Sequence, residues 1–598
     1  MKRILLLLAV LVACTPQDKK SITSDSAQSF LDEYTKEWKR LYYESSKAEW
    51  ASNTMIVEGD TTNSYRTKMA NEALASFTGS ETNINAAKDF LENKEGLSGL
   101  QIRQLERILY GAASNPEVAS DIVKKKISAE TEQTEKLYGY DFKIDGASVS
   151  TNDIDDILRN DSDLNKRLAA WESSKDVGKN LKDGLAELRD LRNQTVQALN
   201  FNDYYTYQVS DYGMTVDEMT TLCDQLISDV WPLYRELHTY LRYELAVKYG
   251  EEVPGLLPAH WLPNRWGQDW SSQVEVQGID LNGVLEEKGS EWLVRQSERF
   301  YVSMGFEELP QSFYDLSSLY PHPDSVDYKK NNHASAWHLD LERDIRSLMS
   351  VVPNSDWYET THHELGHIYY FLEYTSPNVP PLLREGANRA FHEAVGSQMG
   401  LASMQKPFLV GLGLIDENVK TDEVRTLLKE ALNYVVFIPW SAGVMTQFEK
   451  SLYVENLPKD QYNKKWWELK GKYQGIIPPG ERGEEFCDAA SKTHINNDAA
   501  QYYDYALSFA ILFQLHEHIA MNILKQDPRA TNYFGSKEAG QFLKGILSKG
   551  ATEDWRVLMK EATGQDINAI AMLNYFDPLM DYLKEENKGR EHALPESI

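Results

Sequence analysis

The chain has 598 residues, of which 42% are hydrophobic, 11% aromatic and 26% charged. This composition is typical of a globular protein with a large core and excludes disorder for the bulk of the chain. The formal net charge of −29 argues against nucleic acid as a partner, because phosphate binding needs a basic face.

The first residues are typical of a secretion signal rather than of a folded domain. Residues 1–3 include a lysine and an arginine, residues 4–12 form an apolar run, and small residues lead to Cys14. This pattern resembles a bacterial lipoprotein signal, in which the cysteine becomes the lipidated first residue of the mature chain. We therefore expect a signal peptide over residues 1–13 and lipidation of Cys14. The alternative is a plain secretory signal.

The rest of the chain is dominated by helical periodicity. Apolar residues recur every three or four positions over Ser29–Trp50, Leu185–Leu199, Val216–Tyr249 and Val424–Val436. Strand-like alternation is scarce, so the sequence predicts a mostly α fold. We expect a polar tether over residues 14–27 and one continuous domain over residues 28–590, because no flexible linker interrupts it. No later run reaches 18 apolar residues, so the lipid is the only expected membrane contact.

Two cysteines remain after Cys14, namely Cys223 and Cys487. They are too few for a disulfide framework or for a cysteine-based zinc site. We expect both to be buried small residues, with one bridge between them as the alternative.

A metal-binding pattern lies within Thr361–Ile368. His363 and His367 stand four residues apart, with Glu364 directly after the first histidine. On a helix these two imidazoles share one face and can converge on one metal ion. Glu364 is rotated by roughly 100° from His363, which places it beside the open position of the metal, as a base for bound water. This H-E-x-x-H pattern is typical of zinc peptidases, and the alternative is a surface helix with two solvated histidines.

Zinc needs a third protein ligand. The prolines between residues 377 and 381 end the motif helix, and a second apolar-periodic stretch, Ala390–Met399, can fold back beside it. His392 and Glu393 in that stretch are both candidates on their chemistry alone. A carboxylate 26 residues after His367 fits the gluzincin pattern, in which the third ligand is a glutamate of the next helix.

Further motifs follow one another along most of the chain, from about Ser29 to Asn587. They are Leu257–Trp261, Trp266–Trp270, His333–Trp337, His363–Ile368, Leu383–Asn388, Phe391–Ala394, Trp466–Trp467, Lys472–Gly475, Ser536–Gln541 and Tyr575–Phe576. Together they resemble the angiotensin-converting-enzyme family of peptidyl-dipeptidases. The resemblance implies a mostly α, zincin-type metallopeptidase domain with two lobes around a deep central cleft.

The resemblance also implies which residues carry the hydrolysis. His363, His367 and Glu393 match the ligands of one zinc ion. Glu364 matches the base that takes a proton from zinc-bound water as it attacks the scissile carbonyl and passes it to the leaving amine.

Two further groups of residues come from the same resemblance. His494 and Tyr505 match the pair that stabilises the oxyanion, although Tyr505 alone reads as a core aromatic residue. Gln268, Lys492 and Tyr502 match the residues that hold the free C-terminal carboxylate of the peptide. The lysine would pair with that carboxylate and fix how far the chain end lies from zinc.

Residues that contact the peptide backbone are also implied. His333 matches a side-chain contact and Ala334 a main-chain contact. Without the resemblance, His333 is equally well interpreted as a buried histidine beside Trp337.

The resemblance also bears on product length. In a carboxypeptidase relative an arginine replaces the residue at the Gln268 position, so the glutamine favours release of a dipeptide.

The sequence departs from the family where chloride binds. Asp504 stands before Tyr505 where well-known members have a chloride-binding arginine, and Lys470 replaces another such arginine. Because a carboxylate does not hold an anion, chloride activation is doubtful. Asp504 is expected to supply the fixed negative charge itself or to pair with a nearby base.

Two other departures affect the metal and the loop before Tyr505. Ser397, four residues after Glu393, takes the place of an aspartate that supports a zinc-binding histidine. The stretch from His494 to Tyr505 is one residue longer than usual, with Asn496–Asp498 in place of a proline-containing turn.

The sequence therefore predicts a zinc metallopeptidase that releases dipeptides from the free C-terminus of oligopeptides. We expect it in the cell envelope, anchored through Cys14 on the periplasmic or extracellular face, with a secreted or soluble periplasmic protein as the alternative. Three alternative functions remain: a carboxypeptidase or an oligopeptidase on the same scaffold, or a silent peptide-binding relative, which Ser397 and Asp504 would support.

Overall fold

The computed structural model describes residues 23–57, 59–276, 281–323, 325–331 and 333–598. The expected signal peptide over residues 1–13 and the expected lipidation site, Cys14, lie outside these ranges. Helix α1 begins at Ser24, where the side chain of Thr23 caps it and accepts a hydrogen bond from the Ser26 amide. Residues 24–27 are therefore the first turn of a helix, and the tether predicted to reach residue 27 was placed too far along the chain.

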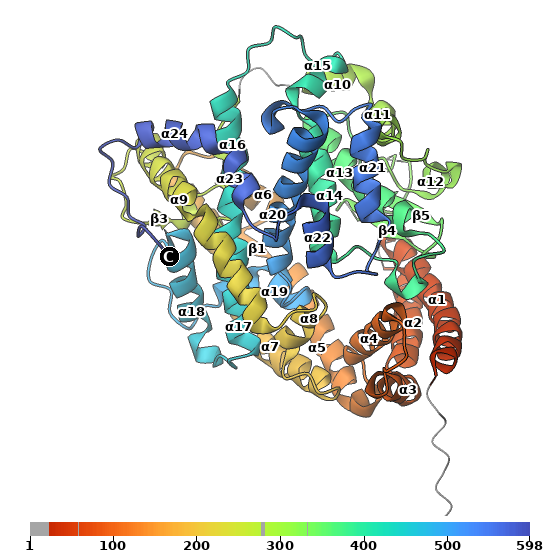
Figure 1. Ribbon diagram of the computed structural model, residues 1–598. Helices are drawn as coiled ribbons and strands as arrows, with labels where there is room; N and C mark the ends of the chain where they lie inside the picture. The colour runs from red at the N-terminus through yellow and green to blue at the C-terminus, as the bar shows by residue number, and fades with distance from the viewer. Residues whose placement is uncertain (1–22, 58, 277–280, 324, 332) are drawn as a thin grey trace, which may run out of the picture.

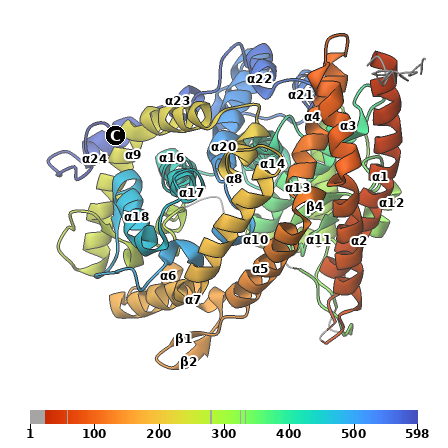
Figure 2. The same ribbon diagram turned by 90° about the horizontal axis from the view of Figure 1, so that it is seen from below.

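Helices α1 to α12 precede the metal-binding motif. The chain begins with α1 (Ser24–Thr54), α2 (Thr62–Thr78), α3 (Glu81–Glu92), α4 (Gly99–Ala113) and α5 (Ser120–Tyr138). These are followed by α6 (Thr151–Asn160), α7 (Leu164–Gln197), α8 (Tyr204–Ser210), α9 (Val216–Tyr249), α10 (Asn282–Lys288), α11 (Ser290–Met304) and α12 (Gln311–Leu316). Helices α1 to α4 gather at one edge of the molecule in two perpendicular views (Figures 1 and 2).

Helices α13 to α24 carry the motif and the rest of the chain. The motif helix and those that follow it are α13 (Ser355–Tyr374), α14 (Arg389–Ser403), α15 (Lys406–Gly411), α16 (Glu423–Ile438), α17 (Thr446–Tyr453), α18 (Tyr462–Leu469), α19 (Thr493–Asn497) and α20 (Tyr503–Glu517). The last helices are α21 (Lys537–Leu547), α22 (Trp555–Thr563), α23 (Ile570–Tyr575) and α24 (Asp577–Glu586). The C-terminal segment returns to α9, where the Trp231 indole donates a hydrogen bond to the Pro595 carbonyl.

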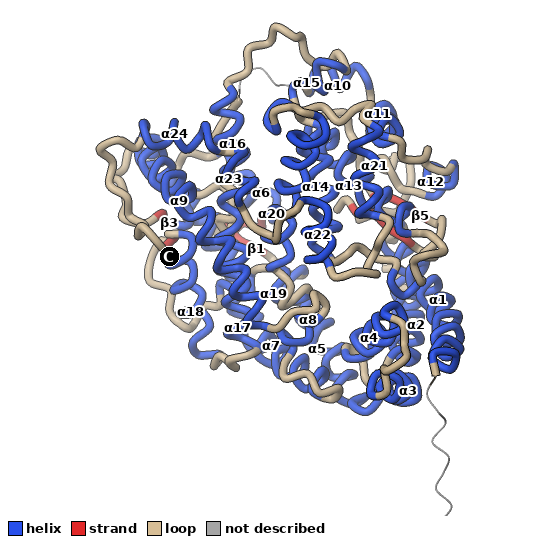
Figure 3. Tube along the Cα trace, viewed as in Figure 1, coloured by secondary structure: helices blue, strands red, loops and turns tan. Residues whose placement is uncertain are grey.

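Strands contribute little to the described part of the chain (Figure 3). They form three two-stranded pairs: antiparallel β1 (Phe142–Ile144) with β2 (Ala147–Val149), parallel β3 (Leu257–Pro258) with β6 (Ile476–Ile477), and antiparallel β4 (Ser335–His338) with β5 (Ile345–Leu348). The prediction of a mostly α fold is confirmed. The predicted helix Val216–Tyr249 coincides with α9, and Val424–Val436 lies within α16.

The main hydrophobic core surrounds the motif helix. Helix α13 packs against α14 and α11, and α14 packs in turn against α20. Buried side chains from these helices and from α9 and α16 join one continuous apolar cluster. A cavity of about 1140 Å³ opens beside this core, with α4, β4, α13, α14 and Tyr505 of α20 in its walls. This cavity corresponds to the predicted cleft.

The segment Tyr503–Leu524 is long and apolar enough to cross a membrane, judged by length and composition alone. Its most apolar 18-residue window has a mean hydropathy of 1.2, and 61% of it is buried inside the protein. Because this segment packs against α14 and α23, it has the environment of a core helix.

The two remaining cysteines, Cys223 and Cys487, are buried and unbridged. This confirms the expectation that they are small core residues.

Candidate active site

The motif helix is defined by its ends. Asn354 caps α13 by accepting a hydrogen bond from the Trp357 amide, and the helix stops at Tyr374, before the prolines expected to end it.

Two glycines let α13 approach α14 closely. A Cβ atom on Gly366 would lie 2.9 Å from the Gly396 Cα, and one on Gly396 would lie 3.0 Å from the His363 ring.

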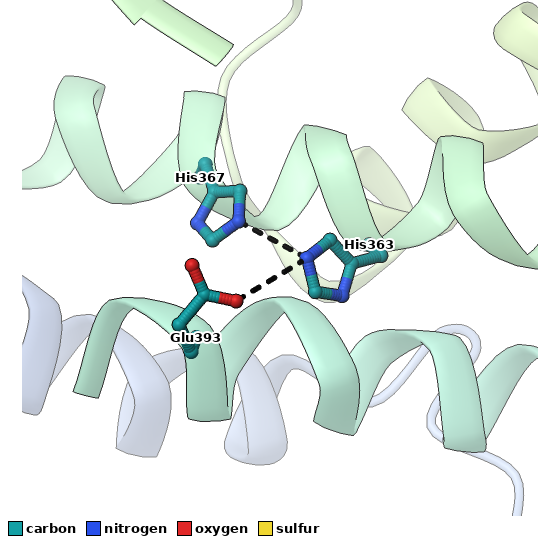
Figure 4. A group of neighbouring side chains, drawn as sticks. All are labelled: His363, His367 and Glu393. Carbon is teal, nitrogen blue, oxygen red and sulfur yellow. Dashed lines mark hydrogen bonds and ion pairs between the residues drawn. The ribbon is translucent and has the colours of Figure 1, made fainter. Parts of the chain in front are cut away.

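Three side chains from these helices converge on one point (Figure 4). The Nε2 atoms of His363 and His367 lie 3.1 Å apart, and Glu393 Oε2 lies 3.9 Å from His363 Nε2. The ligand atoms of the three residues all lie within 4.8 Å of one another. Burial lowers the pKa of both imidazoles, that of His363 to about 4. Each ring is therefore uncharged and can donate a nitrogen lone pair to a metal ion. Two neutral imidazoles and one carboxylate fit a zinc ion.

His392, the other third-ligand candidate, has a different place. Its Nδ1 lies 2.9 Å from Nδ1 of His367, on the side of that ring away from His363. The His392 ring also stacks on Tyr370, with the ring centroids 4.5 Å apart. His392 therefore orients His367, whereas Glu393 completes the metal-binding group.

The support for His363 is weaker. Ser397 Oγ lies 3.5 Å from His363 Nδ1, at the long limit of a hydrogen bond. A serine hydroxyl also carries no charge. The position predicted to lack its supporting carboxylate therefore provides one long, neutral contact to the imidazole.

Glu364 lies against the metal-binding group and lines the cleft. It is 6% exposed, and its Oε2 has no hydrogen-bond partner among the described residues. Burial, with Glu393 nearby, raises the pKa of Glu364 to about 8, and a bound divalent cation would act in the opposite direction. The Oε2 atom of Glu364 therefore faces no competing protein donor, and a bound cation would favour the ionised form that accepts a proton.

His494 of α19 and Tyr505 of α20 are brought together as predicted. Their Nε2 and Oη atoms lie 3.3 Å apart. Burial raises the pKa of Tyr505 to about 12, so its hydroxyl keeps its proton and can donate it. The longer loop between them contains Ala500 at φ 62°, whose amide donates a hydrogen bond of 2.6 Å to Glu449 Oε1. The chain therefore makes a left-handed turn at Ala500, held by this hydrogen bond.

Gln268, Lys492 and Tyr502 also meet. Lys492 Nζ donates a hydrogen bond of 2.8 Å to Gln268 Oε1, and Tyr502 Oη lies 3.5 Å from the same oxygen. Lys492 is 4% exposed and has no carboxylate within 4 Å in the described ranges. Burial, together with Arg265, lowers its pKa to about 7. An arriving carboxylate would relieve that cost, because a buried ammonium is stabilised by an opposite charge.

His333 and Ala334 come directly before β4. Both line the cleft, and His333 Nδ1 lies 2.8 Å from the Ala334 carbonyl oxygen. The His333 side chain is exposed. The alternative interpretation of His333 as a buried histidine beside Trp337 is therefore wrong.

Similarity to known proteins shows the family of this chain. Residues 21–594 match the model of a peptidase family, M2, described as angiotensin-converting enzyme. The chain belongs to the angiotensin-converting enzyme family. Its relatives there include the angiotensin-converting enzyme of Theromyzon tessulatum, which is 30% identical over 96% of this chain and 94% of that protein.

Two other relatives carry the same name. The protein of Haematobia irritans exigua is 32% identical over 72% of this chain and 73% of its own length. That of Mesocricetus auratus is 32% identical over 74% of this chain, but the match spans only 34% of that longer protein. Membership places this chain among the metallopeptidases of the peptidyl-dipeptidase kind.

Asp504, one of the expected departures from the family, is buried beside a basic residue. Its carboxylate is 1% exposed, accepts a hydrogen bond of 2.5 Å from Tyr212 and lies 3.3 Å from the Arg389 guanidinium. Burial raises the pKa of Asp504 to about 7, and Arg389 opposes that shift. Asp504 thus pairs with a nearby base, which was one of its two expected roles.

Lys470, the other residue expected to depart from the family at a chloride-binding position, is a buried basic residue. Its Nζ donates hydrogen bonds of 2.5 Å to the Trp266 carbonyl oxygen and to Gln474 Oε1, four residues later in the chain. Lys175 lines the same small pocket, and neither lysine has a carboxylate within 4 Å in the described ranges. Of the two departures, only Asp504 would therefore repel an anion by its charge.

Sequence reasoning missed two residues of this site. Arg389 forms a two-pronged ion pair with Asp498, at 2.9 and 2.6 Å, in addition to its contact with Asp504. A basic residue next to Asn388, together with an unexpected acidic one at position 504, was the available signal. Glu359, one helical turn before His363, lines a second cavity and lacked any recognised motif.

Proposed function

We propose that this chain is a zinc-dependent peptidyl-dipeptidase that releases dipeptides from the free C-terminus of oligopeptides. The observation that carries the proposal is the Lys492 group. A buried ammonium without an acidic partner in the described ranges lies with Gln268 and Tyr502 on the side of the site that holds Tyr505. A free peptide carboxylate is the anion that would complete this group.

The proposed metal ligands are His363, His367 and Glu393. Zinc held there would polarise the scissile carbonyl and lower the pKa of a water molecule, which are the two effects that metallopeptidases use. The donor set fits this ion better than calcium or magnesium, which prefer oxygen ligands.

The chain's own residues would do the remaining chemistry. Glu364 Oε2 would accept the proton of the attacking water and return it to the leaving amine. Tyr505 and His494 would each donate a hydrogen bond to the developing oxyanion. Their Oη and Nε2 atoms lie 3.3 Å apart, so both can reach the same oxygen. Such donors are worth about 2.7–4 kcal/mol each when aimed at the developing charge.

Backbone contacts would orient the peptide. His333 and Ala334 stand just before β4 and line the same cavities as His363 and Glu364. An extended peptide could exchange hydrogen bonds with this edge, as an added strand does. Because the cleft is enclosed by helices on several sides, oligopeptides are the expected substrates rather than folded proteins.

The Asp504–Arg389 pair bears on anion dependence. We infer that the carboxylate supplies beside Tyr505 the negative charge that an anion would otherwise provide, so that chloride is not needed there.

The proposed location is the cell envelope, through a lipid on Cys14, with the cleft exposed outside the cytoplasm. A Cys14→Ser variant should then move from the membrane fraction to the soluble fraction.

One experiment tests the proposed reaction. The purified protein is incubated with two peptides that share a blocked N-terminus, one with a free C-terminus and one with a C-terminal amide. We expect hydrolysis of the free acid, much slower hydrolysis of the amide, and no hydrolysis after zinc removal by a chelator. Equal rates on both peptides, or activity that survives complete zinc removal, would contradict the proposal.

A further inference from the structure

A second cavity lies beside the metal-binding group. It has a volume of about 370 Å³, and the lining residues that it does not share with the main cleft are Glu359, Thr360, Ser397, Gly400, Asn433, Tyr434 and Phe509. We call it the side pocket. It shares His363 and Glu364, as well as His333 and Ala334, with the main cleft. A side chain directly beside a peptide bond poised at Glu364 would therefore be within reach of this pocket.

Aromatic contacts relate the side pocket to the residues proposed to hold the peptide carboxylate. Phe509 packs against Tyr434 with ring centroids 5.0 Å apart, and against Phe437 at 5.3 Å. Phe437 in turn stacks on Tyr502 at 6.1 Å. One row of rings thus leads from the pocket to Tyr502, so the pocket lies on the side of the leaving dipeptide. The leaving residue next to the cleaved bond is the penultimate residue of the substrate.

Glu359 gives the pocket its charge. It precedes His363 by one helical turn, so both side chains lie on the same face of α13. The absence of a side chain at Gly400 leaves room for it, since a Cβ there would lie 3.3 Å from Glu359 Cγ. The residue is exposed to the pocket, and no described residue forms an ion pair within 4 Å or a hydrogen bond with its carboxylate.

The surroundings of Glu359 add negative rather than positive charge. Desolvation of the carboxylate inside the narrow pocket, and then the charge of Asp356, raise the pKa of Glu359, and Lys429, on the exposed side of α16, is the cation that opposes this shift. Glu430 follows Lys429, and its pKa is raised to about 7 by burial, with a contribution from Glu359. Among the described residues, no lysine or arginine lines the side pocket. A guest cation would therefore meet the Glu359 carboxyl group without a competing cation inside the pocket.

We propose that the side pocket selects a lysine or arginine side chain at the penultimate residue of the peptide, with Glu359 as its ion-pair partner. This inference rests on the proposed dipeptide release. The aliphatic stem would pack on Tyr434 and Phe509, while the cationic end would reach the Glu359 carboxylate. The aromatic rings also favour a cation over a neutral chain of the same length.

The test compares three peptides with a blocked N-terminus that differ only in the penultimate residue, which is lysine, norleucine or glutamate. The expected kcat/KM for dipeptide release is about tenfold higher for lysine than for norleucine, and it is lowest for glutamate. The tenfold factor corresponds to the lower end of the contribution that a hydrogen bond to a charged group makes. In Glu359→Gln the ratio of lysine to norleucine should fall to about one. In Glu359→Lys the preference should reverse in favour of glutamate.

Glu423→Gln is the matched control, because it makes the same change on an exposed position of α16 away from the pocket. It should keep the native ratio. Each ratio is measured within one protein, so a partial loss of folded enzyme cancels, and zinc content is measured alongside. The proposal would be overturned if the lysine-to-norleucine ratio of kcat/KM in the native protein lay within about twofold of one. It would also be overturned if Glu359→Gln left that ratio unchanged. If every peptide loses a dipeptide at the same rate, this inference alone fails, whereas absence of any dipeptide refutes the proposed function as well.

Discussion

Lys492 and Gln268 lie 224 residues apart in the sequence, and Lys492 Nζ donates a hydrogen bond of 2.8 Å to Gln268 Oε1. The carbonyl oxygen satisfies one of the three ammonium protons and leaves the charge unpaired. The ammonium also lies 4.3 Å from the centroid of the Trp266 ring. The proposed function assigns this unpaired charge to the free carboxylate of the peptide.

Lys492→Gln should remove the recognition of the carboxylate. Because a hydrogen bond to a charged group contributes about 1.5–3 kcal/mol, kcat/KM on free-acid peptides should fall by roughly 10–150-fold. The slow hydrolysis of amidated peptides should hardly change. The exposed Lys464→Gln variant controls for loss of a surface charge. An equal loss on both kinds of peptide would show that Lys492 has another role.

Glu364→Gln should separate metal binding from turnover. The amide keeps the size of the side chain but cannot accept the proton of the attacking water, so kcat should fall by about 10²–10⁴-fold. Zinc content, measured by mass spectrometry of the purified protein, should stay at one ion per chain. Glu373→Gln, on the same helix and paired with Lys544, is the control and should remain active. Substantial turnover by Glu364→Gln would refute the assigned base.

Ser397→Asp should strengthen metal binding. A carboxylate at this position would accept the Nδ1 proton of His363 in place of the present 3.5 Å contact. Partners of this kind change metal affinity by about 10–100-fold. The zinc affinity of the native protein, Ser397→Ala and Ser397→Asp would be compared by competition with a chelator. If the aspartate variant binds zinc no more tightly than the alanine variant, the native serine contact is not the limiting feature.

Asp504→Ala should create a dependence on chloride. The change leaves Arg389 with Asp498 alone and disturbs the residue before Tyr505, so kcat should fall by roughly 10–100-fold, as catalytic misplacement does. Addition of about 0.15 M chloride should restore part of this activity, whereas acetate, as the control anion, should restore less. Native activity should change little between the two salts. Several-fold activation of the native protein by chloride would contradict the inferred role of Asp504.

The local part of this site was predictable from the sequence, because it follows from helix geometry. His363 and His367 lie on one face of α13 since residues four apart always do so. The choice between His392 and Glu393 was not local. It depends on how α14 is rotated against α13, and this rotation is set by the close contact of Gly366 and Gly396.

Charge compensation was harder to predict. Asp504 was recognised as unusual, but its partner Arg389 lies more than a hundred residues earlier and carries no motif that links the two. Glu359 was missed for a similar reason, since an acidic residue one turn before a histidine is unremarkable until a pocket forms around it. Exposure of His333 likewise depends on tertiary packing. The start of α1 was missed because the tether was extended through residues 24–27, whereas Thr23 caps the helix.

The central claim is that two residues leave from the free C-terminus, and product length tests it most directly. A peptide with a blocked N-terminus would be digested and its products followed over time by mass spectrometry. We predict successive losses of dipeptides from the C-terminal end, which stop in Glu364→Gln and after zinc removal. Loss of single residues would instead indicate a carboxypeptidase, and internal cuts an oligopeptidase. Either result would contradict this account.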